Sequence, residues 1–374
     1  MNRIVEGKTK IVTPINHAIV ARDPQFAHCP DDWNLISRMP VVEITTKDVL
    51  TANNGELQAD FPGIGIEKTR QAWNTVSLLS SMGVPTAKWG EEPPDGTNIM
   101  YAKACDMLPL EIIMRSRPFG SYNKRHPEDA AQIDDRGRPL RFQYPTFELF
   151  YKDTVAVDEA GNANLIPENK IQVYYTKRDE NRYVEKHTGI RVTLHSDPIV
   201  IINEKTGKWD LYPQKQLAAA YAKTGPIYSI NPTVSPEELS YIKNKIIVPA
   251  FRILEAAWAM TPYMNEDGRA QKIALADIKF EVGRTKEDGE LVLADVIDND
   301  SWRIWRDGDP KQELDKQAFR DGKPDPEVTD KYRKVTQLSE NFKNPNVIEF
   351  IRKMLDDTSL RLPPFVDDKI YLER

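Results

Sequence analysis

The segment from Ala276 to Trp305 restricts the fold more than any other part of the sequence. Polar and apolar residues alternate strictly from Asp277 to Val282, which is typical of a β-strand whose side chains point to opposite faces in turn. Asp288-Gly289 is a turn signal, and a second apolar run follows from about Leu291 to Ile297. The segment therefore predicts a β-hairpin.

Two carboxylates lie on the predicted hairpin. Glu281 and Asp295 would stand close together on neighbouring strands, with Lys279 beside them. Carboxylate oxygens suit a hydrated magnesium ion that carries nucleotide phosphates. The alternative is a solvent-exposed strand face, which commonly carries charges. We favour the metal site because Asp295 is the only charged residue in an apolar run, where a lone carboxylate is costly unless it is paired or bound to metal.

The composition narrows the class of protein. The chain has 374 residues, enough for two lobes, and its 40% apolar and 29% charged residues are typical of soluble globular proteins. Its first residues lack the apolar core of a signal peptide, and no uncharged apolar run approaches the ~18 residues of a membrane span. Cys29 and Cys105 match no disulfide or zinc spacing, and the five histidines form no metal-binding pair. These features predict a cytoplasmic protein.

The charge pattern bears on the substrate. The net charge of −6 argues against broad nucleic-acid binding, so an anionic substrate would need a local basic cluster. Such a cluster surrounds Gly120-Ser121 and consists of Arg115, Arg117, Lys124 and Arg125. Its hydroxyl, backbone N–H and guanidinium groups suit a phosphate monoester. A solvent-exposed basic loop is the alternative, but the predicted strand over 110–115 would hold Arg115 in place.

The N-terminal segment contains a second basic turn. Gly7-Lys8-Thr9-Lys10 lies between two short apolar pairs, which predicts two strands joined at a glycine. Such a turn can lie over phosphates, because glycine permits a close approach and lysine supplies charge. Taken alone, the turn is more typical of a solvent-exposed hairpin.

Helix signals complete the outline. A helix over 67–82 should end at Gly83. A capping box at Ser235 should open a long helix that Pro249 kinks or divides. Two tail helices are expected over 326–342 and 345–355.

We expect an α+β protein with two lobes, divided at residue 109. The first lobe would be 1–109 and the larger lobe 110–374. The larger lobe would include an insertion at about 154–194, read as a surface hairpin or two, and a helical tail at about 326–374.

Several stretches together resemble one family, the phosphoribosylaminoimidazole-succinocarboxamide synthases, or SAICAR synthetases, of purine biosynthesis. Their order and spacing, from residue 4 to about 340, carry the resemblance more than any single motif does. The stretches are Gly7-Lys8-Thr9-Lys10; Asp106-Met107-Leu108-Pro109-Leu110-Glu111 with Met114-Arg115 and Gly120-Ser121; Asp277-Ile278-Lys279-Phe280-Glu281 with Gly283; Asp295, Asp300, Arg303 and Trp305; and Asp315-Lys316 with Phe319-Arg320.

The resemblance implies a two-lobed α+β fold with largely antiparallel sheets, packed helices and an ATP cleft between the lobes. It implies a carbon–nitrogen ligase that uses ATP and Mg²⁺ to join L-aspartate to the carboxylate of CAIR, the carboxylated aminoimidazole ribonucleotide. The products would be SAICAR, ADP and phosphate, formed by way of an acyl phosphate. Catalysis of this kind rests mainly on positioning and charge stabilisation.

The resemblance also assigns roles to residues. ATP would be bound by Gly7, Lys8, Lys10, Lys103, Met107, Glu281 and Asp295, and the metal by Glu281 and Asp295. CAIR would be bound by Arg115, Ser121 and Arg303. The candidate catalytic residues are Lys279, close to the reacting groups, and Lys152, which matches a family lysine near the nucleotide. The expected partners are these small molecules, with no nucleic acid and no membrane, and a homo-oligomer stays open.

The sequence departs from the family pattern at several positions. Val296 stands where a glutamate commonly follows the metal aspartate, so a second acidic contact is missing there. Asn54 stands where an aspartate is usual, and Ser116 replaces an asparagine. The segment 154–194 and the tail beyond residue 340 are longer than in compact bacterial forms.

Two other classes of function are alternatives. A small-molecule kinase on a related ATP-binding scaffold would share the lysines and metal carboxylates but would not need aspartate. A binding protein that keeps the fold without catalysis would fit Val296 and Asn54. The presence of Lys279, Glu281 and Asp295 argues against that second alternative.

Overall fold

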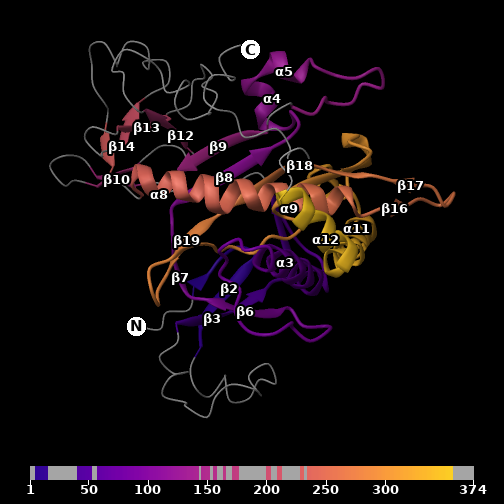
Figure 1. Cartoon of the computed structure of the whole chain (residues 1–374), viewed down its shortest axis with the longest axis horizontal. Coiled ribbons are helices and arrows are strands. Elements are labelled where there is room, and N and C mark those ends of the chain that lie inside the picture. The colour runs from indigo at the N-terminus through magenta and orange to yellow at the C-terminus, as the bar shows by residue number, and fades with distance from the viewer. Residues whose placement is uncertain are drawn as a thin grey trace. The chain divides into compact units, whose positions relative to one another are not determined.

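The computed structural model describes residues 5–15, 40–52, 57–142, 145–151, 155–157, 163–165, 171–176, 199–203, 209–212, 228–230 and 234–356. These residues form an α+β fold with two compact units, and Figure 1 labels many of their elements. The first unit contains the described residues of 1–107, 249–275 and 282–358, and the second those of 108–248 and 276–281.

The first unit contains an antiparallel sheet in the order β1-β2-β3-β6. Its strands are β1 Val5–Glu6, β2 Lys10–Pro14, β3 Val41–Thr46 and β6 Ile99–Lys103. The Gly7 N–H donates to the Lys10 carbonyl at 2.8 Å, so the basic turn closes between β1 and β2 as the sequence predicts.

Shorter strands of this unit form further antiparallel sheets. They are β4 Val49–Ala52 with β5 Leu57–Asp60, β16 Tyr263–Met264 with β17 Ala270–Gln271, and β7 Cys105–Met107 with β19 Val282–Thr285 and β20 Leu291–Leu293. In the last sheet β19 is the central strand.

Helix α3, Ile64–Ser81, confirms the predicted N-terminal helix. Its apolar residues Ala72 and Trp73 pack against Met100 of β6. The helix ends at Ser81 with Met82 as its C-cap, and Gly83 follows with a φ of 80°, the left-handed conformation that glycine adopts without strain.

The C-terminal elements of the first unit are β21 Trp302–Arg306, the 3₁₀ turn η5 Pro310–Gln312, α10 Gln317–Arg320, α11 Asp325–Ser339, the 3₁₀ turn η6 Glu340–Lys343 and α12 Pro345–Asp356. Helix α11 lies along α3 (Figure 1), and Gln71 Nε2 donates to the Tyr332 carbonyl at 2.9 Å and to Thr336 Oγ1 at 3.0 Å. This contact explains why residues 282–358 fall in the same unit as 1–107, whereas the expected division at residue 109 places them in the larger lobe.

The second unit is built on seven strands of an eight-stranded sheet, which follow one another in the order β15-β14-β13-β12-β9-β8-β18. The strands are β8 Leu110–Arg115, β9 Thr146–Tyr151, β12 Ile171–Thr176, β13 Ile199–Asn203, β14 Trp209–Tyr212, β15 Tyr228–Ile230 and β18 Ile273–Phe280. All of their pairings are antiparallel except that of β12 with β13.

The predicted insertion is partly described. The strands β10 Val155–Val157 and β11 Ala163–Leu165 pair as a hairpin, whereas β12 joins the main sheet beside β9. Two short helices, α4 Ser121–Arg125 and α5 Pro127–Ala130, follow β8. Lys152, Asn54, most of the insertion and residues 357–374 lie outside the described residues.

The long helix predicted at Ser235 forms with its capping box intact. It consists of α8 Pro236–Tyr241, the π-helical segment η4 Ile242–Ile247 and α9 Val248–Ala259. Proline has no N–H to give to the preceding turn, so the wider π-helical turn just before Pro249 is the expected adjustment. The predicted division of the helix is confirmed in this form. No helix among the described residues is long and apolar enough to cross a membrane.

The predicted hairpin exists, with two corrections. Its strands are β19 and β20, paired with Val282 opposite Leu293, and Gly289 lies in the turn with a φ of 76°. The alternating strand is interrupted at Glu281, because β18 pairs with β8 while β19 pairs with β20 and β7. The second strand ends at Leu293, so Asp295 follows the strand instead of lying on it.

Candidate active site

Lys10 and Asp295 form an ion pair in the first unit. Strand β2 begins at Lys10, and its Nζ lies 3.0 Å from Asp295 Oδ1. Both side chains are only partly exposed. The sequence predicts both residues at the ATP site, and the fold brings them together from positions 285 residues apart.

Asp295 is held at the start of a turn. Its Oδ1 also accepts a hydrogen bond from the Val296 N–H at 2.9 Å. The Val296 side chain is buried and packs with Ala72, Trp73 and Met100. Position 296 therefore serves the core, and a glutamate there would bring a charge into an apolar cluster.

Lys279 and Glu281 form a second ion pair, at the end of β18 in the second unit. Lys279 Nζ lies 2.6 Å from Glu281 Oε1, and Glu281 is buried. Asp277, on the same face of the strand, is buried too. The alternating charges of this strand are therefore not a solvent-exposed face, and that alternative is wrong.

Asp300 lies in a buried ionic cluster that the sequence did not predict. Lys68, whose side chain is 0% exposed, lies 3.2 Å from Asp300 Oδ2, and Lys316 Nζ lies 3.6 Å from Oδ1. Tyr332 also donates its hydroxyl to Asp300. Burial opposes ionisation of Asp300, but the two lysines and the tyrosine outweigh it and lower its pKa.

The sequence of α3 does contain a signal for this cluster, a row of polar residues on one helix face. Lys68, Gln71 and Thr75 follow one another at helical spacing on the buried side of α3, where apolar residues are expected. Gln71 accepts a hydrogen bond from the Asn299 N–H at 2.9 Å. A polar stripe on the buried face of a helix indicates a fixed polar network.

Arg115 departs from the predicted direct phosphate contact. Its side chain is 2% exposed, its Nε lies 2.8 Å from Glu148 Oε1, and its Nη1 pairs with Asp277. Burial opposes the charged form, but the two carboxylates outweigh it and raise the pKa of Arg115. Nη1 also donates to the Phe119 carbonyl at 3.3 Å, and the guanidinium lies over the Tyr122 ring. Arg115 thus fixes the turn that leads to Ser121.

Ser121 itself is exposed and begins α4 directly after Gly120. Gly120 has φ 63° and ψ −134°, a conformation open in practice only to glycine. The turn therefore presents the hydroxyl and backbone of Ser121 to solvent, as a phosphate site requires.

The other predicted nucleotide residues lie in the first unit. Lys8 is exposed in the β1–β2 turn, Lys103 ends β6, and Met107 on β7 is 46% exposed. Gly283 pairs with Met107, and a Cβ on Gly283 would lie 2.7 Å from the Cys105 Cβ. The glycine thus allows β19 and β7 to approach closely. Arg303, predicted to bind CAIR, lies on β21 and is partly buried.

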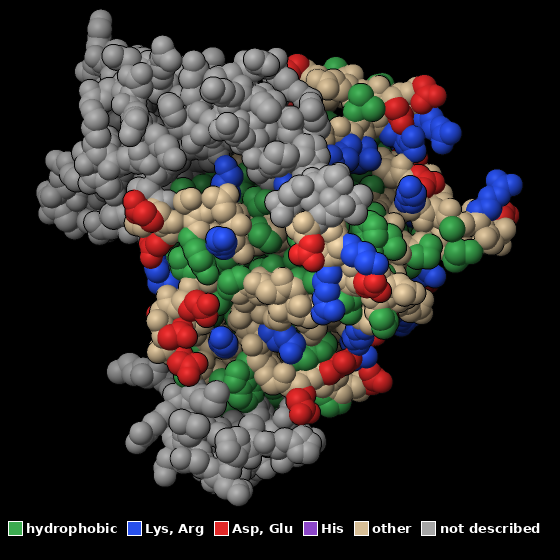
Figure 2. Space-filling view, viewed as in Figure 1, with side chains coloured by type: hydrophobic (Ala, Val, Ile, Leu, Met, Phe, Trp, Pro, Cys, Tyr) green, Lys and Arg blue, Asp and Glu red, His purple; other side chains and the backbone are tan. Residues whose placement is uncertain are grey.

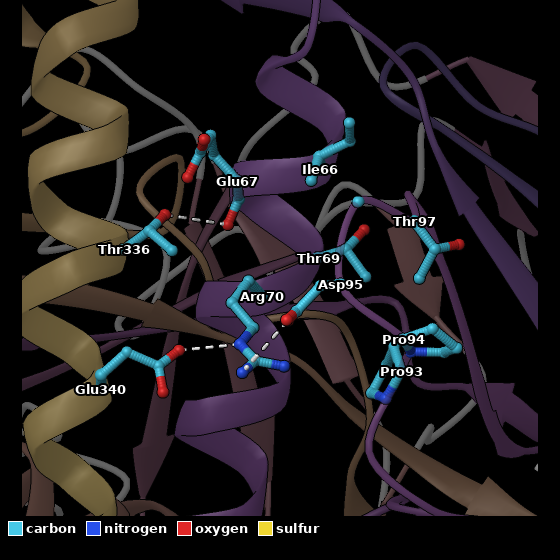
Figure 3. A pocket seen from close by; sticks show the side chains of 11 residues that line it. Ile66, Glu67, Thr69, Arg70, Pro93, Pro94, Asp95, Thr97, Thr336 and Glu340 are labelled. Atoms are coloured by element: carbon cyan, nitrogen blue, oxygen red, sulfur yellow. Dashed lines mark hydrogen bonds and ion pairs between the residues drawn. The ribbon is translucent and has the colours of Figure 1, made fainter.

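A cavity of about 240 Å³ lies between α3, the loop at 93–97 and α11 (Figure 3). Arg70 points into it and pairs with Glu92, Asp95 and Glu340. None of the residues predicted for the active site lines this cavity. On the face shown in Figure 2, acidic and basic side chains are interspersed.

Comparison with known proteins agrees with the residues described. A family model described as SAICAR synthetase matches residues 36–188 and 234–338. The phosphoribosylaminoimidazole-succinocarboxamide synthase of Herpetosiphon aurantiacus is 30% identical over 346 residues, which cover 91% of this chain and 98% of that protein. The enzyme of the same name from Roseiflexus castenholzii is 29% identical over 88% of this chain and 89% of its own length.

Solved structures agree on the fold. A structure described as type-2 SAICAR synthetase in complex with ADP superposes with a TM-score of 0.54 at 22% identity, covering 90% of this chain and 97% of that one. The synthase from Ehrlichia chaffeensis superposes with a TM-score of 0.53 at 19% identity, covering 91% and 98%. The family match, the sequence relatives and the α+β fold lead to one conclusion: the chain belongs to the SAICAR synthetase family, the ATP-dependent ligases of purine biosynthesis.

Proposed function

We propose that the chain joins L-aspartate to CAIR with ATP and Mg²⁺ and releases SAICAR, ADP and phosphate. The observation that carries the proposal is that each carboxylate assigned to the metal is paired with a lysine assigned to ATP or to the reacting groups. These pairs are Lys10 with Asp295 and Lys279 with Glu281.

The donor set fits a magnesium nucleotide. Mg²⁺ prefers carboxylate oxygens, and phosphate oxygens prefer ammonium groups. Glu281 and Asp295 would hold Mg²⁺, and Lys279 and Lys10 beside them would pair with phosphate oxygens of ATP. Each lysine and each carboxylate would then exchange one oppositely charged partner for another. The two ion pairs therefore suit a metal and a nucleotide that bind together. Magnesium would supply charge neutralisation at the transferring phosphoryl group.

The remaining nucleotide contacts follow from their positions. Lys8 and Gly7 lie in a turn that can cover phosphates, and Lys103 adds charge at the end of β6. Met107 supplies an exposed apolar side chain for the adenine.

For CAIR, we assign the phosphate to the exposed turn at Gly120-Ser121, and Arg303 stays a prediction from the family resemblance. Arg115 takes part by holding the Phe119 carbonyl, because its own charge is balanced by Glu148 and Asp277. Lys152 stays a prediction outside the described residues.

The proposed reaction has two steps, a phosphoryl transfer and an amide formation. A carboxylate oxygen of CAIR attacks the γ-phosphorus of ATP, and the bond to the ADP oxygen breaks. The amine of L-aspartate then attacks the acyl carbon. A C–N bond forms, the C–O bond to phosphate breaks, and the proton of the amine passes to the departing phosphate. Lys279 and Lys10 stabilise the negative charge on the transferring group. We place this reaction in the cytoplasm.

The test is ADP release from ATP, Mg²⁺ and CAIR, with and without L-aspartate, together with the absorbance of the product. Turnover that needs aspartate and yields an amide supports the ligase. Stoichiometric turnover without aspartate, leaving a stable phosphorylated acceptor, would establish the small-molecule kinase instead. Asp295→Asn is the control variant, since it removes the metal carboxylate from an otherwise intact turn.

A further inference from the structure

His126, Glu128 and Asp129 form a compact group of metal-binding side chains where α4 gives way to α5. Each residue offers one ligand atom, and these atoms all lie within 4.8 Å of one another. His126 and Asp129 are each 2% exposed, whereas the Glu128 side chain is 54% exposed. Two ligands therefore lie in the interior of the second unit, and the third lies at the surface, where an ion can enter.

The spacing of the atoms suits a bound ion. His126 Nδ1 lies 3.8 Å from Glu128 Oε1, which is too far for a hydrogen bond between these two atoms. Around a tetrahedral zinc ion with bonds of about 2.1 Å, neighbouring ligand atoms lie about 3.4 Å apart. The group is thus slightly wider than a loaded site, and the exposed Glu128 side chain can close the difference by rotating.

Tyr122 orients the two buried ligands. Its hydroxyl donates to Asp129 Oδ2 at 2.8 Å, and its ring stacks on the His126 imidazole with ring centroids 4.2 Å apart. Asp129 Oδ1 accepts a long hydrogen bond, at 3.5 Å, from Nε2 of Gln132, an exposed residue that can move aside for an ion. Hydrogen bonds and packing behind the ligands are typical of metal sites, because they fix the direction of each ligand.

Helix capping is the ordinary alternative, since acidic residues favour the first turn of a helix. Helix α5 has four residues, and its N-cap, His126, makes no side-chain capping hydrogen bond. Capping therefore explains the two acidic residues but not the buried imidazole beside them.

We propose that His126, Glu128 and Asp129 bind a divalent transition-metal ion, for which Zn²⁺ is the best fit. An imidazole nitrogen with two carboxylate oxygens suits zinc, whereas Mg²⁺ prefers oxygen ligands alone. The two carboxylates balance the charge of the ion, and water can take the remaining tetrahedral position. The ion would tie α5 to Tyr122, whose ring lies under the Arg115 guanidinium at 5.0 Å. This inference does not rest on the proposed function.

The test titrates Zn²⁺ into the intact chain, freed of metal with a chelator, by isothermal titration calorimetry in excess Mg²⁺. The Mg²⁺ occupies sites made of oxygen ligands alone, and we expect one Zn²⁺ per chain. Glu128→Gln and His126→Gln should each weaken Zn²⁺ binding at least about tenfold, since even the loss of a group behind a ligand has an effect of that size. Asp135→Asn, which removes another exposed carboxylate of the same unit, is the matched control and should bind Zn²⁺ as the unaltered chain does.

The melting temperature is a second readout. Zn²⁺ should raise it in the unaltered chain and in Asp135→Asn, but not in His126→Gln. If His126→Gln does not fold, Glu128→Gln decides alone, because its side chain lies at the surface.

Three results would overturn the proposal. The first is the lack of any Zn²⁺ binding, and the second is equal affinity in Glu128→Gln, His126→Gln and the unaltered chain. The third is Zn²⁺ binding that Asp295→Asn abolishes while Glu128→Gln keeps it, which would assign the ion to the proposed nucleotide site instead.

Discussion

Lys68 and Arg70 lie two positions apart on α3, so their side chains leave the helix on nearly opposite sides, and each holds carboxylates in a different way. Arg70 pairs with Glu92, Asp95 and Glu340 beside the cavity in Figure 3, and Asp95 is 94% exposed. Lys68 is fully buried against Asp300.

The two clusters differ in what they leave unsatisfied. Around Arg70 each guanidinium nitrogen pairs with one carboxylate, and water can replace any of these carboxylates. In the buried cluster Asp298 keeps one oxygen without a donor among the described residues. The comparison teaches that the surface cluster fastens α3 to its neighbours by exposed pairs, whereas the buried cluster fixes its charges against one another inside the fold.

The largest expected effect is on activity. Asp295→Asn should reduce turnover by about a thousandfold or more, because it removes charge stabilisation from the reacting phosphate. Arg70→Met should leave kcat unchanged. Both are measured as ADP release at saturating substrates. Near-normal turnover in Asp295→Asn would remove Asp295 from the metal site.

The next largest effect is on stability. Lys68→Met should lower the free energy of unfolding by about 3–5 kcal/mol, because it leaves Asp300 buried without its main partner. The double variant Lys68→Met with Asp300→Asn should recover part of that loss. Urea unfolding measures both. If Arg70→Met costs as much as Lys68→Met, the distinction between the clusters does not hold, since exposed pairs contribute only about 0–1 kcal/mol each.

A smaller effect has the opposite sign. Asp298→Asn should raise the free energy of unfolding by about 1 kcal/mol in the absence of metal, because an unpaired buried carboxylate is replaced by a neutral amide. A less stable Asp298→Asn variant would show that the Asp298 charge supports the fold.

The smallest effect depends on pH. Burial opposes ionisation of Glu340, but hydrogen bonds from Asn74, Lys343 and Arg70 outweigh it and lower its pKa to about 2. Because the folded pKa is depressed, the stabilisation is complete above the unfolded pKa of about 4.3 and is lost as pH falls towards 2. The stability difference between Glu340→Gln and the unaltered chain should therefore shrink below about pH 4 in acid unfolding curves. A difference that stays constant down to pH 2 would contradict this account.

Local signals in the sequence predicted much of the fold. The capping box at Ser235, the glycine end of α3 and the turn at Gly289 all form as expected, because each depends on neighbouring residues alone. The family resemblance predicts a site of lysines and carboxylates, and the structure pairs two of these residues, Lys10 and Asp295, across the chain.

Features that depend on distant partners escaped the sequence analysis. The burial of Arg115 depends on Glu148 and Asp277 from the neighbouring strands β9 and β18, and no local pattern shows that register. The end of β20 at Leu293 depends on how β19 pairs with both β20 and β7, which lies far away in the sequence. Lys68 looks like an ordinary helix-surface lysine until its distant partner Asp300 is known.

The packing of α11 on α3 has a consequence for the order of events during synthesis. The first unit cannot be completed when its first 107 residues leave the ribosome, because its remaining parts follow only after residue 248. Until α11 emerges, Gln71 lacks the Tyr332 carbonyl and Asn74 lacks Ser339 Oγ. Until then the polar face of α3 stays exposed to solvent. Because the contacts that cover it join residues far apart in the sequence, this protein should fold slowly for its size.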